Sequence, residues 1–216
     1  MNKIFKTALI IALGSFALSS CKESNEYDYE AEYLKSEQKT DSLLSAQKVK
    51  IEAYKNEFLP NAIEDTVTNT FTYLNKKVKR GIWYHISQEA TDNSYTYGVN
   101  TSGSAIIYPK LKLKYTASLL NSTTPVESDL IGTDYNLGVQ DSKFTSIWYL
   151  SFFPYSVQFN GNPIILGGLT KNGLKKGNKI TVITPSLYAY GANTKTNIPA
   201  NSPLVYTFEV LEISNP

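Results

Sequence analysis

The residues of this chain that could carry out chemistry are few, and most of them have no partner. There is one His, His85, and one Cys, Cys21, so Cys/His nucleophilic or metal chemistry lacks a second member. Ser45 and Lys48 match the spacing S-x-x-K, but they lie in a charged helix-forming stretch and no K-T-G follows. His85 lies in an apolar run and is typical of a strand histidine. We therefore expect no metal, no cofactor and no covalent catalysis.

The composition points to aromatic surfaces instead. The 216 residues are 42% hydrophobic and 19% charged, which is typical of a chain that folds around a core. Tyr dominates the aromatics, with 16 Tyr against 9 Phe and 2 Trp. A Tyr buries apolar area while its hydroxyl stays hydrogen-bonded or wet. Grooves or strands lined by Tyr are therefore favoured.

The N-terminus reads as a secretory leader. Lys3 and Lys6 precede a short apolar stretch and then small residues, an arrangement typical of a signal peptide over residues 1–20. The segment Leu18-Ser19-Ser20-Cys21 resembles the bacterial lipobox, which implies lipid on Cys21. A plain signal peptide with a chance Cys is the alternative. The resemblance predicts a lipid-anchored protein of the bacterial envelope, at the outer membrane or the periplasmic face.

Charge argues against nucleic acid as a partner. Of the 21 Lys and Arg residues, Lys3 and Lys6 leave with the leader, so 19 basic residues face 19 acidic ones. A balanced chain lacks the electrostatic basis of nucleic-acid binding. Residues 22–37 carry six acids against two lysines, which predicts a solvated tether over residues 21–37.

Helix formers follow the tether. Residues 30–58 contain no Gly or Pro and end before Pro60, so a helix is expected there. Its apolar stripe is too short to establish a coiled coil, and both packing on its own domain and weak dimerisation remain open. A second helix is expected over residues 62–74, which would make a helical stalk of residues 38–77.

From residue 78 onward the pattern changes to β-structure. Residues 111–115 alternate strictly, so Leu111, Leu113 and Tyr115 are expected to face a core while the lysines face water. The last run is expected to form a central strand, and residues 170–177 a short helix. The predicted fold is α+β, with a twisted antiparallel sheet packed on that helix. The expected strands cover residues 82–86, 105–108, 111–119, 180–184 and 204–213.

The C-terminal third of the chain contains a series of short motifs. They are Gly173-Leu174-Lys175-Lys176-Gly177, Ile180-Thr181-Val182-Ile183, Tyr188-Ala189-Tyr190-Gly191, Ile198-Pro199-Ala200-Asn201 and Leu204-Val205-Tyr206. In order and in most of their spacing they resemble the closing third of the FKBP-type peptidyl-prolyl cis-trans isomerases. The resemblance extends over roughly residues 78–213, and it implies an FKBP-like domain over residues 78–216.

The resemblance implies a pocket that buries a proline ring among aromatic side chains. The Tyr190 hydroxyl and the Ile198 N–H would orient substrate carbonyls. Leu169 would replace the usual Trp at the pocket floor, and Tyr155 or Phe159 would replace the aromatic wall missing at Val126. The implied catalytic positions are Tyr115, Glu127, Tyr190 and Ile198. The implied pocket positions are Val126, Tyr155, Phe159, Ile165, Leu166, Leu169 and Tyr206.

A long insertion relative to the family covers residues 129–162. Its apolar run, residues 147–155, is expected to be a strand and turn that completes the sheet, with a protein-binding flap as the alternative. The resemblance implies isomerisation of X-Pro bonds in exported polypeptides, with the membrane reached through the lipid anchor. An inactive FKBP-like lipoprotein that binds proteins or acts as a chaperone is the other possibility. The oligomeric state and the client are not determined by the sequence.

Overall fold

The computed structural model describes residues 28–216. Residues 1–20 and Cys21, on which the signal peptide and the lipid anchor were predicted, lie outside this range. None of the helices formed by residues 28–216 combines the length and the apolar composition that a membrane crossing requires.

A 30-residue helix, α1 (Tyr29–Phe58), opens the described chain and confirms the predicted helix. The Asp28 carboxylate accepts a hydrogen bond from the Ala31 N–H at 3.0 Å, which caps the first turn. Its buried residues are Leu44, Gln47 and Ile51, spaced by three and four, so they share one face. The helix begins inside the segment expected to be a tether.

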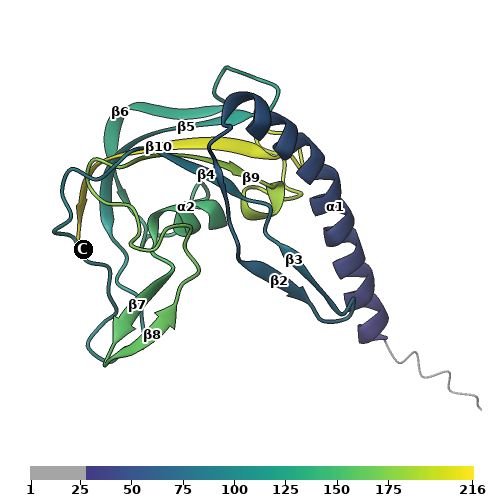
Figure 1. Cartoon of the computed structure of the whole chain (residues 1–216), viewed down its shortest axis with the longest axis horizontal. Helices are drawn as coiled ribbons and strands as arrows, with labels where there is room; N and C mark the ends of the chain where they lie inside the picture. Colours follow the sequence, from purple (N-terminus) through teal and green to yellow (C-terminus); the bar gives the residue numbers. More distant parts are fainter. Residues whose placement is uncertain (1–27) are drawn as a thin grey trace, which may run out of the picture.

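The expected helix over residues 62–74 is wrong, and helical structure ends at Phe58 instead of continuing to residue 77. The chain forms three short strands there, β1 (Ile63–Glu64), β2 (Thr68–Phe71) and β3 (Lys76–Lys79). Thr occupies every second position from residue 66 to 72, and this period of two suits a strand. Strands β2 and β3 pair as a hairpin that runs beside the N-terminal half of α1 (Figure 1).

Six antiparallel strands form the main sheet, in the order β1-β4-β9-β10-β5-β6. Strand β10 lies between β9 and β5, which confirms the expected central strand. The expected strand at residues 105–108 is wrong, because only an isolated bridge between Val99 and Ile106 forms there. The remaining strands of this sheet are β4 (Trp83–Gln88), β5 (Lys110–Leu119), β6 (Glu127–Asn136), β9 (Lys179–Thr184) and β10 (Leu204–Ser214).

The two faces of the sheet are covered by different helices. On β5, Leu111, Leu113 and Tyr115 are buried while Lys110 and Lys112 are exposed, as the alternation predicted. The inner face packs on a short helix, α2 (Ser146–Phe152), which lies under the sheet in Figure 1. On the opposite face, Ile51 of α1 packs against Ile183 of β9 and Val205 of β10. The C-terminal half of α1 is thus part of the domain.

The short helix of the α+β fold exists, but it lies elsewhere in the chain than expected. Residues 170–177 contain no helix, and Gly173 and Gly177 have φ angles of +69° and +90°. A Cβ on Gly173 would lie 2.7 Å from the Phe152 carbonyl oxygen, so this turn requires glycine. The helix is instead α2, inside the run expected to be a strand. Beyond α2, a hairpin of β7 (Ser156–Phe159) and β8 (Asn162–Ile165) projects from the sheet (Figure 1).

Candidate active site

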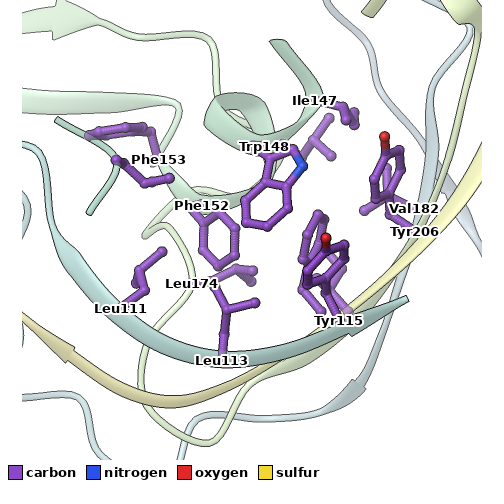
Figure 2. Packing of buried hydrophobic residues seen from close by; sticks show 14 of the residues in the cluster. Leu111, Leu113, Tyr115, Ile147, Trp148, Phe152, Phe153, Leu174, Val182 and Tyr206 are labelled. Carbon is purple, nitrogen blue, oxygen red and sulfur yellow. The ribbon is translucent and has the colours of Figure 1, made fainter. Parts of the chain in front are cut away.

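Trp148 is the centre of the aromatic cluster between α2 and the sheet. Its side chain is fully buried, and Figure 2 shows the indole lying between α2 and the strands. The Trp148 ring centroid lies 4.9 Å from that of Tyr115 and 5.0 Å from that of Phe208. Tyr135 and Phe144 also contact it, with ring centroids at 5.7 and 5.1 Å. The site is therefore walled by aromatics from α2, β5, β6 and β10.

Three of the predicted site tyrosines come together in this cluster. Tyr115 of β5, Tyr206 of β10 and Tyr190 of the loop between β9 and β10 are 8%, 0% and 6% exposed. Tyr206 pairs with Ala117, two residues beyond Tyr115 on the neighbouring strand, so both tyrosines share the inner face. Ile198, 2% exposed, belongs to the same cluster.

Glu127 holds the Tyr190 hydroxyl. The hydroxyl donates to the Glu127 carboxylate, with oxygen–oxygen distances of 2.7 and 2.9 Å to its two oxygens. Glu127 begins β6, and the N–H of the preceding residue, Val126, is bonded to the Ala117 carbonyl. Burial, together with nearby Tyr206 and the bond to Glu127, holds the pKa of Tyr190 well above its usual value. Tyr190 therefore remains a neutral hydrogen-bond donor.

Three polar atoms in the cluster have no hydrogen-bond partner among residues 28–216. They are the Tyr206 hydroxyl, the Trp148 Nε1 and the Thr145 hydroxyl, and all are buried. Thr145 and Tyr190 lie beside the Tyr206 hydroxyl, but neither forms a hydrogen bond of good geometry with it. Burial raises the pKa of Tyr206, so its hydroxyl stays protonated. Unpaired buried donors are rare, and they suit a ligand that brings its own acceptors.

Asp129 positions Tyr135, one of the site walls. Its carboxylate accepts hydrogen bonds from the N–H groups of residues 131–133 and from the hydroxyls of Thr133 and Tyr135. The donated bonds, that of the Thr133 hydroxyl first, hold the pKa of Asp129 far below its usual value. Burial and the bond to Asp129 raise the pKa of Tyr135 to about 12. Asp129 thus closes the turn within β6 and fixes the Tyr135 ring.

The other predicted pocket residues do not lie together: Leu169 belongs to the same buried cluster as Trp148, whereas Tyr155, Phe159 and Ile165 lie outside it. Tyr155 and Leu169 line a separate cavity of about 390 Å³ with Ile63 and Tyr84. Phe159 and Ile165 lie on the projecting β7–β8 hairpin, where Ile165 is 58% exposed. The rings nearest Tyr115 and Trp148 come from other positions than those predicted, namely Tyr135 and Phe144. Val126 and Leu166 are partly buried and pack against the core cluster.

One protein family matches the part of the chain that contains this site. The family model described as FKBP-type peptidyl-prolyl cis-trans isomerase matches residues 107–211, which include Trp148 and all three site tyrosines. The domain formed by these residues belongs to the FKBP-type peptidyl-prolyl cis-trans isomerase family. The matched FKBP-type domain begins just before β5 and ends within β10.

Two bacterial FkpA proteins are similar to this chain in sequence. The FKBP-type peptidyl-prolyl cis-trans isomerase FkpA of Escherichia coli K12 is 23% identical over 257 residues, covering 99% of this chain and 92% of FkpA. FkpA of Buchnera aphidicola is 48% identical over 42 residues, covering 19% of this chain and 17% of that protein.

Solved structures with a similar chain path include two bacterial isomerases. A peptidyl-prolyl cis-trans isomerase of Pseudomonas syringae has 16% identity and a TM-score of 0.48, covering 81% of this chain and 96% of that chain. The crystal structure of FkpA from Escherichia coli has 17% identity and a TM-score of 0.44, covering 83% of this chain and 64% of that chain.

Sequence reasoning missed Trp148, Tyr135 and Asp129 in the FKBP-type domain. The signal for Trp148 was present, because the buried residues Ile147, Trp148, Ser151 and Phe152 recur at helical spacing. Asp129 gave no comparable signal, since its five donors come from a turn whose shape the sequence does not show.

Proposed function

We propose that this chain catalyses cis-trans isomerisation of X-Pro bonds in exported polypeptides, at the side of a bacterial membrane to which Cys21 anchors it. The observation that carries the proposal is the dry aromatic cluster around Trp148 in an FKBP-type domain, with buried donors that lack partners. The leader and the lipobox-like segment, which lie before the described residues, support the location.

Isomerisation of an X-Pro bond requires few catalytic groups from the protein. Rotation about the X-Pro bond breaks amide resonance, with a barrier of roughly 18 to 20 kcal/mol. In the twisted amide, charge is no longer shared between nitrogen and oxygen, so a site of low polarity favours it over the more dipolar planar form. Lowering the barrier therefore requires a dry wall and oriented donors, without a nucleophile or a cofactor.

Each residue of the site has a role in this scheme. Tyr115, Trp148 and Ile198 contact the proline ring. The Tyr206 hydroxyl and the Trp148 Nε1, which have no hydrogen-bond partner among residues 28–216, donate to carbonyl oxygens of the peptide. Glu127 keeps the Tyr190 hydroxyl in place until a substrate carbonyl competes for its proton.

A second function, binding without turnover, is favoured by one observation. The side chains of Trp148 and Tyr206 are both 0% exposed, so a proline ring reaches them only after the site opens locally. A domain that does not open would still present the partly exposed Val126, Tyr135 and Phe144 to a polypeptide. This chain would then act as a protein-binding module or chaperone.

Catalysis of exchange in a proline tetrapeptide separates the two functions. We expect micromolar purified protein to accelerate cis-to-trans exchange, which without a catalyst takes roughly tens to hundreds of seconds. A Trp148→Ala variant should lose the acceleration, whereas Ser45→Ala, on α1, should retain it. No acceleration by the wild type, together with binding to an unfolded proline-containing protein, would favour the binding module.

A further inference from the structure

One polar side chain is buried on the face of α1 that packs against the rest of the chain. Gln47 is 4% exposed and lies between the buried Leu44 and Ile51. Burying an amide is unfavourable unless its hydrogen bonds are replaced. Gln47 makes three of them, and all of them lead to one loop of the FKBP-type domain.

The partners of Gln47 lie at the two ends of that loop. Its Nε2 donates to the Ser186 Oγ at 2.8 Å and to the Asn201 carbonyl oxygen at 2.9 Å. Its Oε1 accepts from the Ser186 N–H at 2.8 Å. The amide therefore joins the start and the end of residues 186–201, which we call the Tyr190 loop because they carry Tyr190 and Ile198.

Backbone bonds close the same loop around Gly191, next to Tyr190. The Gly191 N–H donates to the Ser186 carbonyl at 2.8 Å, and the Asn201 N–H donates to the Gly191 carbonyl at 2.7 Å. A shift of Ser186 or Asn201 would consequently move Gly191, and with it the adjacent Tyr190. A further hydrogen bond fixes the loop to β2, where the Asn69 Nδ2 donates to the Tyr188 hydroxyl at 2.6 Å.

We propose that Gln47 is a positioning residue of the isomerase site, through which the N-terminal helix holds the Tyr190 loop in its substrate-binding arrangement. The proposal rests on the proposed isomerase function. The three hydrogen bonds of Gln47 reach Ser186 and Asn201 and no residue of the aromatic cluster, so it acts through those two residues. Helix α1 is by this reasoning a working part of the site and not only a spacer.

Loss of the amide should loosen the loop. Gln47→Met keeps an unbranched side chain of similar length but removes the donor and the acceptor. The buried Ser186 N–H would then lack its partner, which favours loop conformations that expose it to water. When only a fraction of molecules holds the binding arrangement, the apparent affinity falls by that fraction. We expect KM to rise about threefold to tenfold with kcat nearly unchanged.

Ile51→Ala is the matched control for this variant. Ile51 lies one turn further along the same face of α1, but it packs on Ile183 and Val205 instead of on the loop. Its truncation should lower the melting temperature as Gln47→Met does, while KM stays at the wild-type value. Ser186→Ala removes one of the three bonds from the loop side, so it should raise KM in the same direction by less. It also keeps the test possible if Gln47→Met fails to fold.

Hydrogen exchange of the Gly191 and Asn201 amides gives a readout that does not need catalysis. We expect both amides to exchange faster in Gln47→Met than in Ile51→Ala at equal global stability. Equal exchange and an unchanged KM in Gln47→Met would overturn the positioning role. If the wild type shows no isomerase activity, the proposed function fails, and the exchange comparison alone then decides whether Gln47 holds the loop.

Discussion

The unpaired hydroxyl of Tyr206 leads to an unusual prediction, in which stability and activity change in opposite directions. Tyr206→Phe keeps the ring, whose centroid stacks 5.5 Å from that of Phe208, and removes only the buried oxygen. An unsatisfied buried polar group costs about 1 to 3 kcal/mol of folding free energy. Because Thr145 and Tyr190 lie beside the hydroxyl, we take the low end, about 1 kcal/mol. The variant should therefore be more stable than the wild type.

The size of both effects can be measured. For a chain of this length, about 1 kcal/mol corresponds to a rise in melting temperature of about 2 to 4 °C. If the hydroxyl donates to a substrate carbonyl, its loss removes a bond of net value about 0.5 to 1.5 kcal/mol. That predicts a fall in kcat/KM of roughly twofold to twelvefold. Calorimetry and the tetrapeptide assay on the same preparation give both numbers.

Tyr73→Phe is the matched control, since Tyr73 is 43% exposed and stacks on Tyr33 at the β2–β3 hairpin. It should change neither the melting temperature nor kcat/KM. If Tyr206→Phe instead melts lower and isomerises as fast as the wild type, the hydroxyl has a structural partner in solution. The assignment of the buried donors to the substrate would then be wrong.

Three further outcomes are expected. Tyr190→Phe removes the donor to Glu127, so unlike Tyr206→Phe it should lower both the melting temperature and kcat/KM, the latter roughly twofold to twelvefold, and Tyr190→Ala should cost more. A melting temperature of Tyr190→Phe above that of the wild type would contradict the bond. Because the pKa of Asp129 is lower in the folded state than in the unfolded state, its ionised carboxylate stabilises the fold at pH values above the unfolded pKa of about 3.9. This contribution is lost as the pH falls below that value. The stability gap between wild type and Asp129→Asn should be constant near neutral pH and shrink in unfolding titrations below about pH 4; a gap that persists would exclude this linkage. Cys21→Ala should release the protein from the membrane fraction. The wild-type protein should remain there during a high-salt wash, because multiple acyl chains anchor a protein stably. Extraction of the wild-type protein by salt would argue against lipidation.

The sequence predicted the sheet better than the elements that pack on it. Strands β5 and β10 could be predicted from the alternation of apolar and polar residues, since one face of each strand is buried. The segments at residues 62–74 and 147–152 were assigned to the wrong class because short apolar runs fit both periods. There the deciding information is tertiary, because the buried residues of α2 pack on the inner face of the sheet.

The site could be predicted where it lies on regular strands or on a motif with fixed spacing. Tyr115, Tyr206 and Tyr190 were found in this way, and the structure brings them together. The central Trp148 was not predicted, because residues 170–177 were taken for the short helix, whereas that helix is α2 and carries Trp148 against Tyr115. The hydrogen bonds of Gln47 lie beyond sequence reasoning altogether, since they join residues 139 and 154 positions apart.

The central place of β10 has a consequence for how the protein is made. Leu204 pairs with Leu119 on one side and with Thr184 on the other, so β10 joins two parts of the sheet that are otherwise unpaired. A chain synthesised and moved across a membrane from its N-terminus delivers β10 after every other strand of the sheet. Contacts of such long sequence separation form slowly. On the proposed export of this chain, the six-stranded sheet would be completed only after β10 has crossed the membrane.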